Sequence, residues 1–553
     1  MAPSRPLFAD DSAETAADRP QLVANWETLQ RIFIRPEDEA SRTALVKYME
    51  QILFGLHDFL RRHVGITRAA SLEDLANRFT DSRIAWNPRQ KLADVIAALI
   101  DEIAPHAVNI ASPYFIGHMT SAVPFFMVHL HTIMAALNQN PVKLETSKVV
   151  SILERQVLAK LHRMVYDRDD AFYDGNIQAP GTTLGAFVSG GTVANLTALW
   201  VARNTALGPL SGFDGVEAEG MGAALEAHGW ERCVVLVSRL GHYSLRKSGG
   251  VLGIGNRNVL QVEVDAEGRM DLADLRRIVD QLGTRTKVLA IVGIAGATET
   301  GTVDPLESLS AYCREIRAHF HVDAAWGGPT LLSPKYRRLL SGIQRADSVT
   351  VDGHKQFYMP MGCGVVLFRD PTAMNAVAYH AAYVNRPTSV DLGIRSLEGS
   401  RAAASLVLGS ALEIMGAGGY ALLIEHGIET ARAFAEAIRR RPLFELTTAP
   451  RLNILTYRIV PPSLRRAWEA GSARERHRIT EELNRITTTV QRRQREAGRS
   501  FVSRTTIRRA GKDDVNVFRA VIMNPMTTPA ILEEILDEQE GIYRATFEGE
   551  GGG

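Results

Sequence analysis

Short apolar runs alternate with helical patterns through the middle of the chain, from about residue 110 to 410. Brief apolar runs are typical of strands buried on both faces. The clearest helix is predicted over 271–283, where apolar residues recur at three- and four-residue spacing and Gly283 marks the end. This alternation favours a mostly parallel seven-stranded sheet covered by helices, which is an α/β fold. The expected strands are 184–188, 233–238, 259–264, 288–293, 320–325, 348–351 and 364–368.

The residues before this region have a different pattern. Residues 1–20 are polar and rich in Pro, Ala and Asp, so we expect a disordered tail there. Residues 21–110 are predicted to be an N-terminal helical segment for dimerisation, with an amphipathic helix from 23 to about 64. The predicted apolar face of that helix consists of Leu45, Met49, Ile52, Leu53 and Leu56.

After about residue 415 the pattern changes again. Strands are predicted at 452–460 and 515–522, and a helix is predicted to begin at Pro529. A charged helix between the strands has an apolar stripe made by Ile479, Leu483, Ile486 and Val490. We therefore predict a large domain over 111–414, a small α+β domain over 415–545 and a glycine-rich tail over 546–553.

Composition narrows the function classes. The 553 residues are too many for a single hydrophobic core. The 63 Lys and Arg nearly balance the 62 Asp and Glu, so charge gives no reason to expect a nucleic-acid or membrane-surface partner. Three widely spaced cysteines, and an N-terminus without the features of a signal peptide, indicate a cytoplasmic protein. We expect no transmembrane helix and no metal site.

A turn of small residues follows the predicted strand that ends at Val188. Gly190 and Gly191 allow a ligand close to the backbone, and the helix that follows offers free N–H groups at its N-terminus. The hydroxyls of Ser189 and Thr192 add donors. The turn is thus a candidate phosphate site, although glycines that serve only tight packing would give the same pattern.

Two further residues lie at strand ends. Asp323 ends an apolar strand, where ligands of parallel sheets bind, and its carboxylate can pair with a cation. A lone aspartate there more often caps the next turn. Lys355 follows another apolar strand, and partial burial would make its amine a nucleophile. A lone lysine is more often a solvated surface charge, but here apolar segments flank it on both sides.

The order of these features resembles fold type I of the pyridoxal-phosphate enzymes, the aspartate-aminotransferase-like fold. Five motifs resemble, more narrowly, the group II pyridoxal-phosphate-dependent amino-acid decarboxylases, over residues 112 to 524. They are Ser-Gly-Gly-Thr-x-Ala-Asn at 189–195, His-Tyr-Ser at 242–244, Gly-Ala-Thr-x-x-Gly-x-x-Asp-Pro at 296–305, His-Val-Asp-Ala-Ala at 321–325 and Asp-x-His-Lys at 352–355.

The resemblance implies pyridoxal 5'-phosphate as cofactor and assigns its contacts. Lys355 would hold the cofactor as a Schiff base, Asp323 would pair with the ring nitrogen, and His242 would stack on the ring. Ala325 would pack on the other face of the ring, and Thr298 matches a family threonine near the cofactor. The remaining implied contacts lie at or near the phosphate, and they are Gly190, Gly191, Thr192 and His354.

The resemblance also implies substrate and catalytic contacts. Arg519 matches an arginine that pairs with the acidic side chain of the substrate, although an internal salt bridge is the alternative. His118 and Thr120 align with the family's N-terminal substrate segment. Tyr383, in a loop resembling the family's mobile catalytic loop, would return a proton to the α-carbon, with Tyr379 as the rival.

The implied activity is α-decarboxylation of an acidic amino acid. Similarity to the bacterial aspartate 1-decarboxylases favours L-aspartate, and L-glutamate, cysteine sulfinate and other group II substrates are alternatives. A lyase of the aldolase type, or a non-catalytic pyridoxal-phosphate-binding protein, would give the same cofactor motifs. The resemblance also implies a homodimer with a shared active site and a small-molecule amino-acid substrate as ligand.

Overall fold

The computed structural model describes residues 8–9, 39–61, 65–68, 71–380, 389–508 and 513–548. The chain divides into two compact units. The first comprises residues 1–115 with 492–501, and the second comprises 116–491 with 502–553. Every residue of the site described below that the structure describes belongs to the second unit.

A seven-stranded sheet is the centre of the second unit, in the order β3-β9-β8-β7-β6-β4-β5. Strand β9 runs antiparallel to both of its neighbours, and the remaining pairs are parallel. The predicted mostly parallel seven-stranded sheet is thus confirmed. Its strands are β3 (Gly185–Val188), β4 (Arg232–Ser238), β5 (Val259–Val262), β6 (Thr286–Ile294), β7 (His319–Asp323), β8 (Ser348–Asp352) and β9 (Gly364–Phe368).

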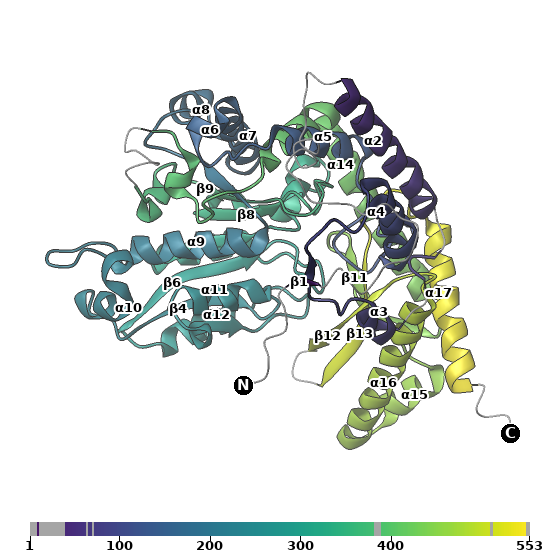
Figure 1. Cartoon of the computed structure of the whole chain (residues 1–553). Helices are drawn as coiled ribbons and strands as arrows, with labels where there is room; N and C mark the ends of the chain where they lie inside the picture. Colours follow the sequence, from purple (N-terminus) through teal and green to yellow (C-terminus); the bar gives the residue numbers. More distant parts are fainter. Residues whose placement is uncertain are drawn as a thin grey trace, which may run out of the picture. The chain divides into compact units, whose positions relative to one another are not determined.

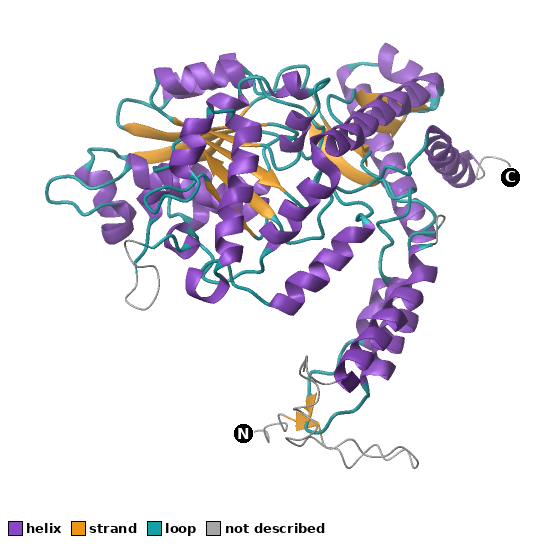
Figure 2. Cartoon of the chain, turned by 90° about the horizontal axis from the view of Figure 1, so that it is seen from above, coloured by secondary structure: helices purple, strands orange, loops and turns teal. Residues whose placement is uncertain are grey.

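Helices cover both faces of this sheet (Figures 1 and 2). Side chains of a strand alternate between its faces, so Val234 and Leu236 join one core while Val235 and Val237 join the other. The first core includes residues of α7, α13 and α14, and the second includes residues of α9 and α11. The helices are α5 (Phe125–Leu137), α6 (Leu144–Ser147), α7 (Val149–Tyr166), α8 (Asp170–Asn176), α9 (Gly191–Ala206), α10 (Val216–Ala227), α11 (Tyr243–Val251), α12 (Leu272–Gln281), α13 (Leu306–Glu315) and α14 (Ala404–Arg440).

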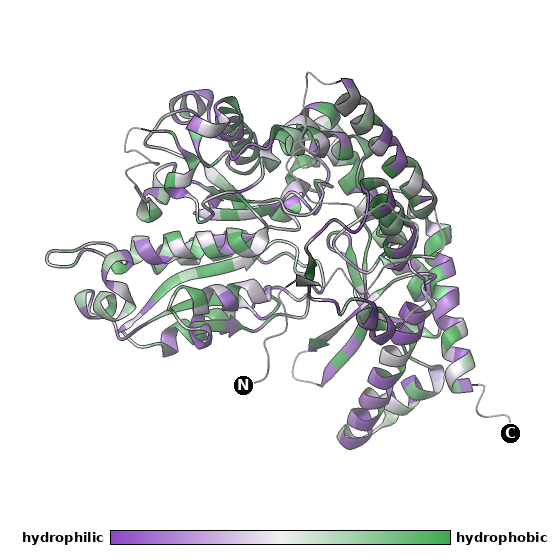
Figure 3. Ribbon diagram, viewed as in Figure 1, coloured by the Kyte–Doolittle hydropathy of each residue, from purple (hydrophilic) through white to green (hydrophobic). Residues whose placement is uncertain are grey.

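A second, antiparallel sheet has the strand order β10-β11-β13-β12. Its strands are β10 (Phe444–Thr448), β11 (Ile454–Ile459), β12 (Ser503–Arg508) and β13 (Asp514–Val521), and the helices of this region are α15 (Pro462–Ala470), α16 (Ala473–Ala497) and α17 (Pro529–Tyr543). The two central strands were predicted from sequence and the two edge strands were not. Edge strands bury fewer side chains than central strands do. The residues of β12 are mostly polar, and its exposed positions alternate with buried or half-buried ones. The predicted stripe of α16 is buried, whereas most of this helix is polar (Figure 3).

Helix α14 crosses the predicted domain boundary at 414/415. It is interrupted at Gly416, whose φ of 62° lies in the left-handed region that glycine adopts without strain. By length and composition alone, α14 is the one helix in the described part of the chain that could span a membrane. The helix packs against α5, α7 and α17, and many of its apolar side chains are buried, whereas Ile414 and Leu422 are 56% and 70% exposed.

The first unit contains α2 (Glu39–Leu60), α3 (Leu72–Arg78) and α4 (Leu92–Ala98). Strands β1 (Phe8–Ala9) and β2 (Ile84–Ala85) pair in parallel, although Phe8 and Ala9 fall in the segment expected to be disordered. The predicted helix face is only partly correct. Met49, Ile52 and Leu56 are half-buried, but Leu53 is 46% exposed, and nothing is described of the side chain of Leu45.

Candidate active site

A cavity of about 430 Å³ opens beside the ends of β3, β7 and β8. Parallel strands present their carboxyl ends at the same edge of a sheet, which is why residues far apart in sequence meet there. All nine residues predicted to contact the cofactor line this cavity, together with His118. They are Gly190, Gly191, Thr192, His242, Thr298, Asp323, Ala325, His354 and Lys355.

The phosphate turn joins the end of β3 to the first turn of α9 and is built without side-chain bulk. A Cβ atom on Gly191 would lie 2.8 Å from Oδ2 of Asp352, and one on Gly190 would lie 3.4 Å from Cε1 of His354. Glycine at 191 is therefore required by space. The N-terminus of α9 next to this turn suits an anion, because its N–H groups have no partner within the helix.

Lys355 extends from the loop after β8 into the cavity, where its Nζ lies 3.0 Å from Oδ2 of Asp352. Asp352 is only 2% exposed, and its buried Oδ1 has no hydrogen-bond partner in the part of the chain that the structure describes. Nε2 of His354 lies 3.7 Å from the same carboxylate, and Nδ1 of that ring lies 2.6 Å from the carbonyl oxygen of Cys363. The amine is thus held by a buried carboxylate at the edge of the cavity.

Asp323 ends β7 with both carboxylate oxygens in use. Oδ2 accepts a hydrogen bond from Nδ2 of Asn195 at 2.9 Å, and Oδ1 accepts one from the backbone N–H of Ala325 at 3.2 Å. His242 is the N-cap of α11 and also lines the cavity. Burial lowers the pKa of His242, the charge of Lys355 lowers it further, and the charge of Asp323 opposes both. The imidazole is therefore neutral near pH 7.

The three predicted substrate contacts lie near one another. Nδ1 of His118 is 3.3 Å from Oγ1 of Thr120. Burial lowers the pKa of His118, and the positive charges of Arg519 and Lys355 lower it further. These effects keep His118 neutral at neutral pH, so it can donate a hydrogen bond but offers no charge.

Arg519 is buried on β13 and does not itself line the cavity. Its guanidinium donates to the carbonyl oxygens of Thr298 and Gly117, each at 3.1 Å. Its Nε is buried, and no described residue accepts a hydrogen bond from it. Burial lowers its pKa, and the charge of Glu299 opposes that effect. Among the described residues Arg519 forms no ion pair within 4 Å, so the alternative of an internal salt bridge is not found there.

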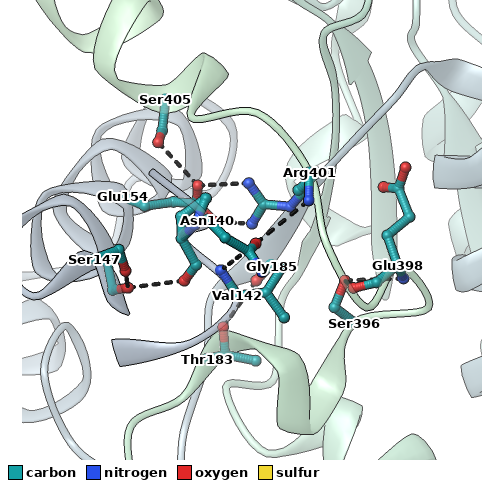
Figure 4. Close-up of polar contacts among 12 residues, drawn as sticks. Asn140, Val142, Ser147, Glu154, Thr183, Gly185, Ser396, Glu398, Arg401 and Ser405 are labelled. Atoms are coloured by element: carbon teal, nitrogen blue, oxygen red, sulfur yellow. Dashed lines mark hydrogen bonds and ion pairs between the residues drawn. The ribbon is translucent and has the colours of Figure 1, made fainter. Parts of the chain in front are cut away.

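Tyr383 lies in 381–388, outside the described residues. The rival Tyr379 does not line the cavity, since its hydroxyl lies 2.9 Å from Oε1 of Glu217 and its side chain is 55% exposed. Residues that follow this loop contact the phosphate turn, where the backbone N–H of Ser189 donates to Oε2 of Glu398 at 3.1 Å. Three residues further on, Arg401 forms a bidentate ion pair with the fully buried Glu154 (Figure 4).

Two polar residues of the site were not assigned roles from the sequence. Asn195 ends the first motif, four residues into α9, so its helical position could have placed it facing the sheet. Asp352 ends β8 as Asp323 ends β7, and that shared strand-end position was the available signal. The roles of the predicted residues stay predictions, and the geometry fits a phosphorylated cationic ring bonded to Lys355.

The amino-acid sequence is similar to a known protein family and to known members of it. A family model described as "Pyridoxal-dependent decarboxylase conserved domain" matches residues 81–460. The chain is 44% identical over 528 residues to an aspartate 1-decarboxylase of Aliivibrio fischeri, covering 95% of this chain and 96% of that protein. It is 28% identical over 461 residues to an L-2,4-diaminobutyrate decarboxylase of Rhizobium meliloti, covering 82% and 83%.

A solved structure with the same fold is the glutamate decarboxylase domain of diaminobutyrate-pyruvate transaminase and L-2,4-diaminobutyrate decarboxylase from Vibrio parahaemolyticus. The TM-score is 0.78 at 22% identity, over 94% of this chain and 100% of that chain. This similarity shows the fold alone.

Proposed function

We propose that this chain, which belongs to the pyridoxal-dependent decarboxylase family and is therefore a pyridoxal-phosphate-dependent carboxy-lyase, converts L-aspartate into β-alanine and carbon dioxide. The family match confirms the predicted cofactor and reaction class. The observation that supports the substrate is the 44% identity to an aspartate 1-decarboxylase over nearly the full length of both chains. The diaminobutyrate decarboxylase of R. meliloti is more distant, at 28%.

The cofactor, when bound, supplies an electron sink for the electrons of the broken Cα–carboxyl bond. The chain's own groups prepare that chemistry. With the cofactor bound, the carboxylate of Asp323 would hold a proton on the ring nitrogen and so keep the ring electron-poor. Lys355 would supply the amine that bonds the cofactor, and its partner Asp352 could take or return a proton at Nζ.

The acidic side chain of the substrate is bound near Thr298, with Arg519 behind it. Two backbone carbonyl groups hold the guanidinium, and among the described residues its Nε has no acceptor and its charge has no carboxylate within 4 Å. His118 and Thr120 add neutral donors. A charge in a site that excludes water attracts a carboxylate far more strongly than it would in solvent.

The proton that replaces the lost carboxyl group comes from Tyr383 or from Lys355. Exclusion of water and other proton donors from the cavity would let the α-carbon be protonated at the intended position.

Carbon dioxide release from L-aspartate, L-glutamate and cysteine sulfinate tests the substrate directly. We expect aspartate to have the highest kcat/KM. Glutamate differs by one methylene, which is worth about 1–3 kcal/mol of discrimination, and is the second candidate. A higher kcat/KM for glutamate or cysteine sulfinate would reject aspartate as the substrate.

Arg519→Met tests the proposed carboxylate pairing. Removing one member of a buried charge pair costs about 2–5 kcal/mol, so kcat/KM for the acidic substrate should fall by at least about 30-fold while cofactor absorbance remains. The matched control is Arg458→Met on the neighbouring strand β11, where the arginine pairs with Glu445. Similar activity in both variants would show that Arg519 does not bind the substrate.

We also propose that the protein is a cytoplasmic homodimer. Large apolar side chains of α5 are exposed in the single chain, including Phe125 at 78%, Ile133 at 49% and Leu137 at 48%. Exposed apolar side chains grouped on one element are typical of an interface between proteins. Sedimentation of the wild type and of Phe125→Glu would show a dimer that the substitution weakens, and a monomeric wild type would contradict the proposal.

A further inference from the structure

One side chain, Asn195, connects the two residues that flank the predicted cofactor ring. Its Nδ2 donates to Oδ2 of Asp323 at 2.9 Å and to Oγ of Ser244 at 3.1 Å. The hydroxyl of Ser244 lies 2.8 Å from Nδ1 of His242. Asn195 is 1% exposed and lines the cavity, yet no step described so far uses it.

The direction of each hydrogen bond follows from two groups that cannot change role. The carboxylate of Asp323 only accepts, so the amide nitrogen of Asn195 must face it. The backbone N–H of Ser244 only donates, and it points to Nδ1 of His242 at 3.3 Å. Nδ1 is therefore without a proton, and the Ser244 hydroxyl donates to it while accepting from Asn195. The proton of the neutral imidazole then lies on Nε2.

The carbonyl oxygen of Asn195 extends this network, and the donor and acceptor of each further hydrogen bond follow in the same way. Oδ1 of Asn195 faces Nε2 of His321 at 3.0 Å, so that nitrogen is the donor. Nδ1 of His321 then accepts from the hydroxyl of Ser348 at 2.8 Å, and Ser348 accepts from Nε2 of His319 at 2.7 Å. Burial lowers the pKa of His321 to about 4, so the ring stays neutral, as this chain of bonds requires.

We propose that Asn195 is a positioning residue whose amide fixes the carboxylate of Asp323 toward the ring nitrogen and, through Ser244, keeps the Nε2 proton of His242 available to the cavity. With the cofactor bound, an imidazole stacked on its ring would offer this Nε2 proton to the α-carboxylate of the substrate. The inference rests on the cofactor of the family and is independent of which amino acid is the substrate.

The test is the affinity of the cofactor-free full-length chain for pyridoxal 5'-phosphate, measured by absorbance from pH 6 to 9. Asn195→Asp has nearly the same shape but replaces the donor facing Asp323 with an oxygen. Asn195→Ala removes the contacts altogether. Thr197→Val on the same helix is the control, because the one bond of its hydroxyl to a described residue is to the carbonyl oxygen of Val193 in its own helix.

The expected results differ in their pH dependence. Asn195→Ala should bind the cofactor about 10- to 100-fold more weakly at every pH, the loss expected when a hydrogen bond to a charged group is removed. Asn195→Asp should bind as weakly at pH 9 but recover toward pH 6, where the two facing carboxylates share a proton. The other titratable groups facing this position are His321 and His242.

Three outcomes would overturn the proposal. In the first, Asn195→Asp binds pyridoxal 5'-phosphate with wild-type affinity across the pH range. In the second, Asn195→Ala binds it as tightly as Thr197→Val does. In the third, both Asn195 variants bind it equally weakly at every pH, which would indicate that Asn195 contributes packing alone. Circular dichroism of each cofactor-free variant checks that it is folded. Because no substrate is added, an error in the substrate assignment leaves these results unchanged.

Discussion

The buried ion pair between Glu154 and Arg401 should be one of the most sensitive points of the large domain. Glu154 is completely buried on α7 and accepts two hydrogen bonds from Arg401 and one from the hydroxyl of Ser405 at 2.8 Å (Figure 4). Arg401→Met would leave the carboxylate buried, with the Ser405 hydroxyl as its one remaining hydrogen-bond donor among the described residues. Removing one partner of such a pair typically costs about 3–5 kcal/mol of the free energy of unfolding.

The double variant should be less damaging than this single one. When Glu154→Leu is combined with Arg401→Met, no charge is left unpaired in the interior, and such replacements are often neutral or stabilising. A matched surface control is Arg369→Met, which breaks the partly exposed pair with Asp347 and should cost no more than about 1 kcal/mol. The measurement is urea unfolding followed by circular dichroism, at one fixed protein concentration because assembly changes apparent stability.

A cost below about 1 kcal/mol for Arg401→Met, equal to that of the surface control, would refute this reasoning.

The ion pair between Glu154 and Arg401 also has a consequence for the candidate active site. Glu398 lies three residues before Arg401 and accepts a hydrogen bond from Ser189 in the phosphate turn. Arg401→Met should therefore weaken cofactor binding as well as folding, and the absorbance titration used for Asn195 measures that effect.

Three further predictions concern single side chains. Gly191→Ala should weaken cofactor binding at least about tenfold by absorbance titration, because the new methyl meets the carboxylate of Asp352, whereas Gly250→Ala, with nothing within 4 Å, should bind normally. His321 has a native pKa of about 4 and an unfolded pKa of about 6.5, so the unfolded chain binds more protons between these values and stability falls as the pH falls from 6.5 to 4. In His321→Gln the denaturation midpoint should change less over that window, and equal slopes would contradict the prediction. Tyr383→Phe should lower kcat for carbon dioxide release by about 10²- to 10⁴-fold with normal cofactor absorbance, and unchanged kcat would assign the proton to another group.

The sequence predicted the central sheet because its strands are buried on both faces. A strand such as β8, with every residue buried, gives an apolar run that stands out from its surroundings. Strands β10 and β12 lie at the edges of the small sheet and contain Glu, Thr, Ser and Arg. Their pattern of polar and apolar residues therefore does not distinguish them from loops. Leu53 shows a different limit of prediction from sequence. Helical spacing identifies the apolar side of a helix, but it does not show whether another part of the protein covers that side.

The candidate site was predictable where strand ends determine position. Asp323 and Lys355 follow apolar strands, and parallel strands bring such residues to one edge without any knowledge of side-chain contacts. Arg519 was predicted by resemblance, but its bonds to the carbonyl oxygens of Thr298 and Gly117 depend on how two segments of the chain fold together. No pattern along β13 contains that information.

Polar networks are hardest to predict, because their members are chosen by proximity and not by spacing. Asn195 and Asp323 are 128 residues apart in the sequence. His321 can form a hydrogen bond with Asn195 only because His321 and Asp323, two residues apart on β7, lie on the same side of that strand. A buried amide with both ends bonded cannot rotate without leaving a donor or an acceptor unpaired, which costs about 1–3 kcal/mol for each group. Groups on β7, α9 and α11 together thus determine which nitrogen of His242 carries the proton, and the fold couples the chemistry of His242 to that of Asp323.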